Sequence, residues 1–387
     1  MSNIREDFLL DPDVVFLNHG SFGACPRPVF SAYQEWQRRL ETQPVAFLGR
    51  QAETRLRESR EALAAYLNVS AADLVFFPNP TTAVNMVMRG IALQPGDDVL
   101  TTDHEYGALE RAWHVRCRET GARLVIHRLD LSSPEALVED LWAAVTPATR
   151  VLFISHITSA TALIFPVAEL CRRARATGIL TVIDGAHAPA QVPLDLSALD
   201  ADVYVGACHK WMCSAKGASF LHARPSIQAR LRPLVVSWGW GDDVYEAQAG
   251  MGETEFIRWH QWQGTRDIAA FLTVPAAIEY QAAHDWPRRR LACAELLARA
   301  LHGIERLTGL PPFAAPIERW HAQLGVARLP DSVDTDALKR RLYDVHRIEV
   351  PVHRWNGQPL IRVSCQVYNT DADIAALHQA LAAELPA

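Results

Sequence analysis

The chain contains very little lysine. Among its 387 residues there are only three, Lys210, Lys216 and Lys339. Arginine serves as well as lysine on a solvated surface, so this bias by itself says little about the fold. A reaction that needs a neutral amine, such as Schiff-base formation, has only these three candidates, because arginine stays protonated. Any amine chemistry of this protein is therefore confined to three positions.

The sequence also lacks the features of membrane, secreted and nucleic-acid-binding proteins. No apolar run reaches the roughly 18 residues of a membrane span, and the first residues, MSNIREDFLL, include acids where a secretory signal would be basic. A net charge of −6 without a basic run argues against nucleic acids and anionic membranes as partners. We therefore expect a cytoplasmic protein.

Cysteine offers no metal site. The seven cysteines are scattered, and no CxxC motif or Cys/His pair has the spacing of zinc ligands. An odd number also argues against a complete disulfide framework. We expect no bound metal, and we expect most of these cysteines to be small core residues in a reducing compartment.

What is present is the pattern of a large α/β domain. Short runs rich in Val, Ile, Leu and Phe alternate with amphipathic stretches, which indicates a mostly parallel sheet with helical connections. The near-continuous apolar runs predict strands that are buried on both faces. The expected strands are 73–77, 97–102, 123–129, 150–157, 179–186 and 202–208. The expected helices lie near 82–92, 106–121, 134–145 and 166–177.

After about residue 265 the pattern changes. Two long helices are expected near 266–284 and 287–307, followed by a proline-rich connection. Short strands within VARLP, IEVPVHR and LIRVSC and helices near 335–345 and 371–384 then predict a smaller α+β domain.

Asp184 and Lys210 form the most informative pair. Each follows an apolar strand, so both are expected at the edge of the sheet where ligands of open α/β folds bind. An amine and a carboxylate placed in this way can hold pyridoxal phosphate, because the amine forms an aldimine and the acid pairs with the pyridine nitrogen. Spacing alone leaves a second interpretation equally open, in which Asp184 is a turn residue and Lys210 a surface lysine.

The other two lysines are weaker candidates. Lys339 lies in the charged amphipathic stretch DALKRRLYDV, which is typical of a solvated helix face. Lys216 precedes Gly217 in an apparent turn, whereas Lys210 directly follows an apolar strand and an imidazole. We therefore favour Lys210 and regard Lys216 as its competitor.

DGAHAPAQ followed by CHKW resembles the class V aminotransferase superfamily of fold-type I pyridoxal phosphate enzymes, and within it the isopenicillin N epimerase-like branch. Similar motifs extend over some 350 residues: FLNHGSFGACP, NPTTAVN, DHEYGALERAW, SHITSATALIFPV, QGTRD and IRVSCQVYNT. The resemblance implies an N-terminal segment that borders the active site (1–20), a large cofactor-binding domain (21–270) and a small C-terminal domain (271–387).

The resemblance also implies how the cofactor is held. Thr81 and Thr82 would bind its phosphate at a helix N-terminus, which is a natural anion site, and His209 would reach the same phosphate. Many relatives carry serine two positions before this histidine, where this chain has Ala207, so one phosphate hydroxyl is expected to be missing. Tyr106 would lie over the pyridine ring and could donate a proton, with His104 as a weaker candidate. His187 would contact the phenolic oxygen of the cofactor.

Two further expectations concern the partner subunit and the substrate. By resemblance, Thr265 in QGTRD would reach the phosphate bound in the neighbouring subunit, which implies a homodimer with shared sites. Arg362, inside an apolar strand, requires either a structural carboxylate partner or the carboxylate of an amino acid substrate, and the resemblance favours the substrate. Asn18, His19 and Ser21 would border the site, with Asn18 and His19 as substrate contacts.

The reaction is less determined than the cofactor. In each case the freed Lys210 would remove the Cα proton of an amino acid. An epimerase then needs an acid on the opposite face, a C–S lyase needs one near the leaving sulfur, and a transaminase can use Lys210 alone; Tyr106 could serve the first two. The stretch IEVPVHRWNGQPL lacks the nucleophilic cysteine of similar desulfurases, and Cys365, which follows Arg362 on its strand, is poorly placed to replace it.

We expect an epimerase or racemase. A C–S lyase related to the sulfoxide lyases, or an aminotransferase, is the alternative. The retention of both Lys210 and Asp184 argues against a non-catalytic binding protein.

Overall fold

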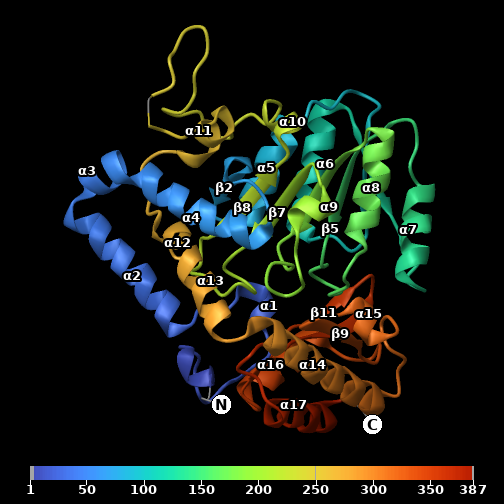
Figure 1. Cartoon of the computed structure of the whole chain (residues 1–387). Coiled ribbons are helices and arrows are strands. Elements are labelled where there is room, and N and C mark those ends of the chain that lie inside the picture. Colours follow the sequence, from blue (N-terminus) through green and yellow to red (C-terminus); the bar gives the residue numbers. More distant parts are fainter. Residues whose placement is uncertain (1–3, 249, 386–387) are drawn as a thin grey trace.

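The computed structural model describes residues 4–248 and 250–385. A seven-stranded sheet lies at the centre of its larger part, in the order β2-β8-β7-β6-β5-β3-β4 (Figure 1). Strands β3 to β7 run parallel, whereas β8 is antiparallel to both of its neighbours, β2 and β7. The strands are β2 (Leu74–Phe77), β3 (Asp98–Thr102), β4 (Arg123–His127), β5 (Thr149–Ser155), β6 (Leu180–Gly185), β7 (Val203–Ala207) and β8 (Ser219–Ala223).

The sheet is buried on both faces, as its apolar runs predict. Successive residues of β5 alternate between two core clusters: Leu152 belongs to the first, and Val151 and Phe153 to the second. Because side chains alternate across a strand, an uninterrupted apolar run fills both cores. All six strands predicted between residues 73 and 208 are confirmed, with ends shifted by at most a few residues.

Helices connect the strands and cover the two faces of the sheet (Figure 1). All four helices predicted in this region are confirmed. They are α5 (Pro80–Gly90), α6 (Gly107–Thr120), α7 (Pro134–Ala143) and α8 (Val167–Thr177), and the shorter α9 (Leu196–Leu199), α10 (Pro225–Gln228) and α11 (Glu255–Gln261) follow.

The N-terminal region contributes two long helices that extend from the body of the molecule (Figure 1). The elements are a 3-10 turn (Ile4–Asp7), β1 (Val15–Phe16), α1 (His19–Phe22), α2 (Arg27–Thr42), α3 (Pro44–Ala46), a π-helical turn (Phe47–Gln51), α4 (Ala52–Leu67) and a 3-10 turn (Ala71–Asp73). The sequence patterns that we considered predicted none of them.

One prediction needs correction. The expected continuous helix over 266–284 is interrupted, and it forms α12 (Ala269–Leu272) and α13 (Val274–Ala283) with Thr273 between them. The cause is Pro275, which lacks an N–H for the helical ladder and restricts the residue before it. The second predicted helix is confirmed as α14 (Trp286–Thr308).

The C-terminal part is a three-stranded antiparallel sheet with helices, in the order β11-β12-β9. It has its own core cluster, to which Leu17 from the N-terminal segment also belongs. Val15 of β1 pairs with Ile348 of β10, so the start of the chain joins this part of the fold. Its elements are α15 (Ile317–Trp320), β9 (Leu324–Arg328), α16 (Thr335–Asp344), β10 (Ile348–Glu349), β11 (Val352–Trp355), β12 (Gln358–Ser364) and α17 (Asp371–Glu384).

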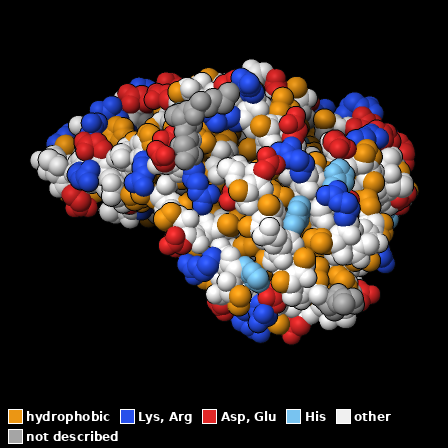
Figure 2. All heavy atoms as spheres, turned by 90° about the horizontal axis from the view of Figure 1, so that it is seen from below, with side chains coloured by type: hydrophobic (Ala, Val, Ile, Leu, Met, Phe, Trp, Pro, Cys, Tyr) orange, Lys and Arg blue, Asp and Glu red, His pale blue; other side chains and the backbone are white. Residues whose placement is uncertain are grey.

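The surface is mixed in character. On the face shown in Figure 2, basic and acidic side chains alternate and apolar ones are scattered among them. Within the described part of the chain, no helix has both the length and the apolar character that a membrane crossing requires.

Candidate active site

A pocket of about 220 Å³ lies at the carboxyl edge of the parallel strands. It receives residues from the ends of β5 and β6, the loops after β3 and β7, the start of α5 and the N-terminal segment. Several predicted site residues line it: Thr81, Tyr106, Asp184, His187, His209 and Lys210. Residues that are more than 100 positions apart in sequence thus meet at one edge of the sheet.

Lys210 lies in the short connection by which the chain turns back from β7 into antiparallel β8. Burial lowers the pKa of its amine to about 8, while the nearby Asp184 carboxylate acts in the opposite direction. Asp184, at the end of β6, is almost fully buried and accepts a hydrogen bond from the backbone N–H of Ala186 at 2.9 Å. Burial also raises the pKa of this carboxyl group.

His187 lies between Lys210 and Trp211. Its Nε2 is 3.1 Å from the Lys210 amine, and its Nδ1 accepts a hydrogen bond from the indole N–H of Trp211 at 3.2 Å. Burial holds the pKa of His187 well below its usual value, and the positive charge of Lys210 lowers it further. The ring is therefore neutral near pH 7. Trp211 was not predicted as a site residue, although it follows Lys210 directly in CHKW.

The N-terminus of α5 opens toward the pocket, but only one of the two threonines expected at the phosphate faces it. Asn79 is the N-cap: its side-chain oxygen accepts the backbone N–H of Thr82 at 2.8 Å and the Thr82 hydroxyl at 3.0 Å. Thr82 is thus turned toward Asn79, and it is Thr81, together with Asn79 and Pro80, that lines the pocket. The sequence does not show which of the two threonines faces the pocket. Adjacent residues of a helix point in different directions, and only the structure fixes which one faces the pocket.

His209 also lines the pocket. Its Nδ1 donates to the backbone carbonyl of Ala218 at 2.8 Å, and burial lowers the pKa of the ring to about 4. Ser219 pairs with Ala207 across β7 and β8, and its hydroxyl lies 3.5 Å from His209 Nδ1. Side chains of directly paired residues lie on the same face of a sheet. The neighbouring strand thus carries a hydroxyl beside Ala207, but Ser219 is fully buried and does not line the pocket.

Tyr106 and Glu105 differ sharply although they are adjacent. The Tyr106 ring lines the pocket and is 45% exposed. Glu105 points inward, where its two oxygens accept hydrogen bonds from the hydroxyls of Thr102 at 2.7 Å and Ser155 at 2.6 Å. Burial raises the pKa of Glu105 to about 8, and the Asp184 charge raises it further. Sequence reasoning missed Glu105, because nothing in DHEYGA distinguishes an inward from an outward acid.

Arg362 of β12 reaches the same region from the C-terminal part. Its guanidinium donates to the backbone carbonyl of Ser159 and, at 3.0 Å, to the hydroxyl of Ser21, and both serines line the pocket. Burial lowers its pKa to about 10. Among the described residues it forms no ion pair, and its buried Nε has no hydrogen-bond partner. The structural ion pair that the sequence left open is thus absent from the described chain.

The N-terminal segment lies behind Lys210. His19 is fully buried; its Nε2 is 3.1 Å from the Lys210 backbone carbonyl and its Nδ1 is 2.9 Å from the Tyr368 hydroxyl. Asn18 donates to Glu349 at 2.9 Å. Neither side chain lines the pocket, whereas Ser21 does.

Gly23 allows the N-terminal segment to lie close to the backbone of His209 and Lys210. It has a φ of 72°, and a Cβ at this position would lie 2.1 Å from the backbone oxygen of His209. Only glycine combines this backbone conformation with such a contact.

The remaining predicted residues lie outside the pocket. Thr265 is exposed on the surface, and so are the other two lysines, Lys216 and Lys339. None of the three lines the pocket around Lys210. Of the three amines, the structure brings only Lys210 together with the carboxylate and imidazole groups that the sequence singled out.

Comparison with known proteins places this architecture in context. The family profile of the class V aminotransferases matches residues 15–377. Isopenicillin N epimerase from Amycolatopsis lactamdurans is 38% identical over 98% of this chain and 97% of its own length. A putative L-cysteine desulfhydrase from Oryza sativa subsp. japonica is 29% identical over 98% of this chain and 87% of its own.

The fold has close counterparts among solved structures. The C–S lyase C-DES, solved as a mutant with glycine covalently linked to the PLP cofactor, superimposes with a TM-score of 0.85 at 21% identity, and the match covers 99% of each chain. At this identity the comparison shows a shared fold.

Proposed function

The chain belongs to the class V aminotransferase family of pyridoxal phosphate enzymes, and we propose that within it the protein is an epimerase or racemase acting at the Cα of an amino acid. The similarity to isopenicillin N epimerase over nearly the full length supports this proposal. The substrate would carry a free amino group and a carboxylate on the same carbon.

The side chains in the pocket fit the cofactor. Lys210 offers a largely buried amine of lowered pKa. Only one Asp184 oxygen accepts a hydrogen bond within the described residues, which leaves the other for a pyridine N–H. The α5 N-terminus and Thr81 on one side and His209 on the other would hold the phosphate.

When bound, pyridoxal phosphate acidifies the Cα proton of an attached amino acid by withdrawing electrons from it. Lys210 would then take or return this proton on one face of the substrate. Arg362 would orient the substrate by binding its carboxylate, since its buried Nε is unpartnered and its other nitrogens are held by Ser159 and Ser21. Glu105, which is largely protonated near neutral pH, would leave the negative charge beside the cofactor ring on Asp184.

The observation that carries the proposal is the pair of proton-transfer groups in this pocket. Lys210 and the phenol of Tyr106 both line it and come from different strand ends. Inversion at carbon needs one such group on each face. By contrast, the described residues that line the pocket include no cysteine, and Cys365 is fully buried. Persulfide formation on an enzyme thiol therefore has no nucleophile here.

The proposal is tested by following the Cα proton in deuterated solvent. Wild-type protein is expected to convert either enantiomer of its substrate into the other with incorporation of deuterium. In Tyr106→Phe, Lys210 should still exchange the Cα proton of one enantiomer, but inversion should be lost. Tyr343→Phe, which changes a partly exposed tyrosine on α16, should behave like the wild type. If Tyr106→Phe inverts its substrate at the wild-type rate, the assignment of Tyr106 is wrong.

C–S lysis is the second candidate, supported by the desulfhydrase relative and by the C-DES fold. In this reaction Tyr106 would donate its proton near the leaving sulfur instead of to Cα. The same experiment distinguishes the two reactions, because lysis of an S-substituted cysteine releases pyruvate and ammonia, whereas epimerisation releases neither. Stoichiometric release of pyruvate would replace the epimerase proposal with this one.

We also infer a homodimer. Thr265 is exposed and lies outside the pocket of its own chain, so a role at the cofactor phosphate would require a second copy. This inference rests on the family resemblance of QGTRD and on the position of Thr265 on the surface.

A further inference from the structure

A second pocket lies between the two parts of the fold and shares no lining residue with the candidate active site. Its volume is about 420 Å³. It forms where the end of β4 meets the turn between β11 and β12. Charged residues at its border are Asp103, Arg128, Asp130 and Arg328, and apolar walls come from Leu129, Leu131, Phe313 and Trp355.

The two arginines of this pocket are unpaired. Within residues 4–248 and 250–385, neither Arg128 nor Arg328 forms an ion pair or a side-chain hydrogen bond, and Nε of Arg328 is buried without a partner. Most arginines of this chain, by contrast, bind a carboxylate or a backbone carbonyl. A buried guanidinium N–H without an acceptor is costly, so the buried Nε of Arg328 indicates an acceptor that is supplied from outside. Arg128 is exposed, and it adds a second positive charge at the border of the pocket.

The two aspartates are also incompletely used. Asp103 accepts the side-chain amide of Asn356 at 2.8 Å through one oxygen, while the other, Oδ1, is buried without a hydrogen bond among the described residues. His104 Nε2 lies 3.5 Å from the same oxygen, but burial lowers the pKa of this imidazole to about 4, so the ring brings no positive charge near pH 7. Asp130 accepts the backbone N–H of Ser132 at 2.8 Å through one oxygen. Charges of both signs thus surround the pocket without neutralising each other by direct contact.

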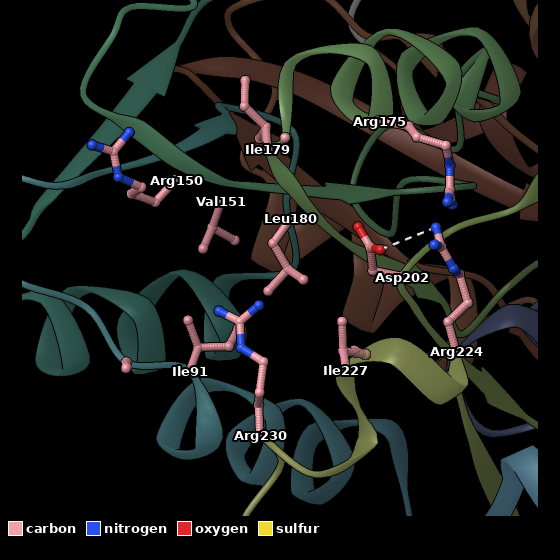
Figure 3. Close-up of a pocket in the computed structure, with 12 residues that line it drawn as sticks. Ile91, Arg150, Val151, Arg175, Ile179, Leu180, Asp202, Arg224, Ile227 and Arg230 are labelled. Atoms are coloured by element: carbon pink, nitrogen blue, oxygen red, sulfur yellow. Dashed lines mark ion pairs between the residues drawn. The ribbon is translucent and has the colours of Figure 1, made fainter.

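A pocket at the opposite edge of the sheet provides a contrast (Figure 3). It is also rich in arginine, but three of its four arginines are paired within the chain. Arg224 binds Asp202 at 3.2 Å, as the dashed line in Figure 3 marks, Arg175 binds Asp200 at 2.9 Å, and Arg150 binds Asp97 at 3.2 Å. The fourth, Arg230, is exposed to solvent, so no buried charge among these arginines calls for a charged ligand.

Aromatic rings form one wall of the second pocket. The Arg328 guanidinium lies 5.3 Å from the centre of the Phe313 ring, and Phe313 meets Trp355 edge to face at 5.4 Å. A hydrogen bond holds the Trp355 ring in place: its indole N–H donates to the backbone carbonyl of Asp103 at 3.0 Å. A rigid wall of this kind suits an apolar or aromatic group of a ligand whose charged end meets the arginines.

We propose that this pocket binds a free α-amino acid with an apolar side chain. The carboxylate of the ligand would bind Arg328 and Arg128, its ammonium group would lie toward Asp103 and Asp130, and its side chain would contact Phe313 and Trp355. A zwitterion satisfies both unpaired charge types at once, whereas a simple anion or cation would leave one of them uncompensated. The site is independent of the reaction that the enzyme catalyses.

The experiment uses holoenzyme reduced with borohydride, so that Lys210 is permanently linked to the cofactor and its amine no longer exchanges with free amino acids. Titration calorimetry with L-phenylalanine should show one site per chain. Arg328→Met and Arg128→Gln should each weaken binding about tenfold or more, because each removes a charge-assisted hydrogen bond. Arg230→Gln, which changes an exposed arginine of the pocket in Figure 3, should leave binding unchanged.

Two analogues test the charge assignment. 3-Phenylpropanoate lacks the ammonium group of phenylalanine and 2-phenylethylamine lacks its carboxylate, and each should bind about tenfold or more weakly than phenylalanine. Binding of 3-phenylpropanoate as tight as that of phenylalanine would overturn the zwitterion assignment.

Three further results would overturn the site itself. The first is that reduced wild-type protein does not bind phenylalanine up to about 10 mM. The second is that both arginine variants bind it as tightly as the wild type. The third is that Arg362→Met loses binding while Arg328→Met keeps it, which would place the ligand in the candidate active site. Because Arg128 is exposed, Arg128→Gln is expected to fold even if Arg328→Met does not.

Discussion

The indole N–H of Trp211 donates a hydrogen bond to Nδ1 of His187 over 3.2 Å. An indole nitrogen can only donate, so the neutral His187 ring must carry its own proton on Nε2. That proton faces the Lys210 amine at 3.1 Å, where only a neutral amine can accept it. The hydrogen-bond network thus fixes the tautomer of His187, and this tautomer favours the neutral amine of Lys210. Burial has the same effect, since it lowers the pKa of this amine to about 8.

Replacing Trp211 should therefore change how Lys210 depends on pH. In the wild-type apoprotein, the rate of covalent capture of pyridoxal phosphate should rise with pH through about 8, since the neutral amine reacts. In Trp211→Phe, His187 can present an unprotonated Nε2 to a lysine ammonium, which should raise the midpoint by about one pH unit. The absorbance of the bound cofactor reports this rate.

Trp320→Phe is the matched control for this variant. Trp320 is also fully buried, but its indole N–H has no hydrogen-bond partner among the described residues. Both variants should lose a similar amount of stability, and only Trp211→Phe should shift the midpoint. Equal shifts in the two variants would contradict the role of the Trp211 hydrogen bond.

Glu105→Gln should affect stability in a pH-dependent way. The pKa of Glu105 is raised to about 8 in the folded chain, so between its unfolded value and pH 8 the folded state binds more protons and stability falls as pH rises. Glutamine does not ionise, so the variant should match the wild type near pH 4 and exceed it by roughly 2–4 kcal/mol at pH 8. Denaturant unfolding of the wild type and of Glu105→Gln at the two pH values measures this difference.

Gly23→Ala should displace the backbone that carries Lys210 while leaving the lysine side chain itself unchanged. Its φ of 72° costs an alanine about 1 kcal/mol, and the added Cβ would meet the His209 backbone oxygen at 2.1 Å. Gly309→Ala separates the two effects, because Gly309 has a φ of 67° and no atom within 4 Å of its would-be Cβ. Both variants should be less stable, but only Gly23→Ala should slow capture of pyridoxal phosphate. Normal capture by Gly23→Ala would show that the N-terminal segment does not position Lys210.

Mixed dimers should reveal whether Thr265 acts in the neighbouring site. Lys210→Ala lacks the amine, and Thr265→Asp should repel the cofactor phosphate, so each variant alone should be inactive. If Thr265 serves the other subunit, a heterodimer contains one site with both residues intact, and an equal mixture should recover about a quarter of the wild-type sites. If Thr265 acts within its own chain, or if the protein is monomeric by sedimentation, mixing restores nothing.

The parts of the fold that were predicted are those with a strong local signal. The strands β2 to β7 are mostly apolar runs bounded by polar residues, and such a run can be recognised as a strand from its own few residues. β8 was missed because its five residues, SFLHA, form a short run whose direction depends on the turn before it. The broken helix at Thr273 was missed because the apolar period continues through Pro275.

The same distinction applies to the candidate site. Asp184 and Lys210 were identified because each directly follows a strand, and a strand end has a definite place at the edge of the sheet. The capping role of Asn79, the inward orientation of Glu105 and the hydrogen bond from Trp211 to His187 were not visible, since a side chain's partner depends on residues that the fold brings near it.

By itself, the sequence determined the α/β class and restricted any amine chemistry to three lysines, because these depend on composition and on local periodicity. It also predicted the edge of the sheet at which Lys210 lies. Only the tertiary structure decided which groups meet there. Arg362 reaches Ser159 and Ser21 across more than 200 positions, and His187 acquires its tautomer from a residue 24 positions away. Such contacts arise from the packing of whole elements, in which buried polar groups must find partners wherever the fold places them.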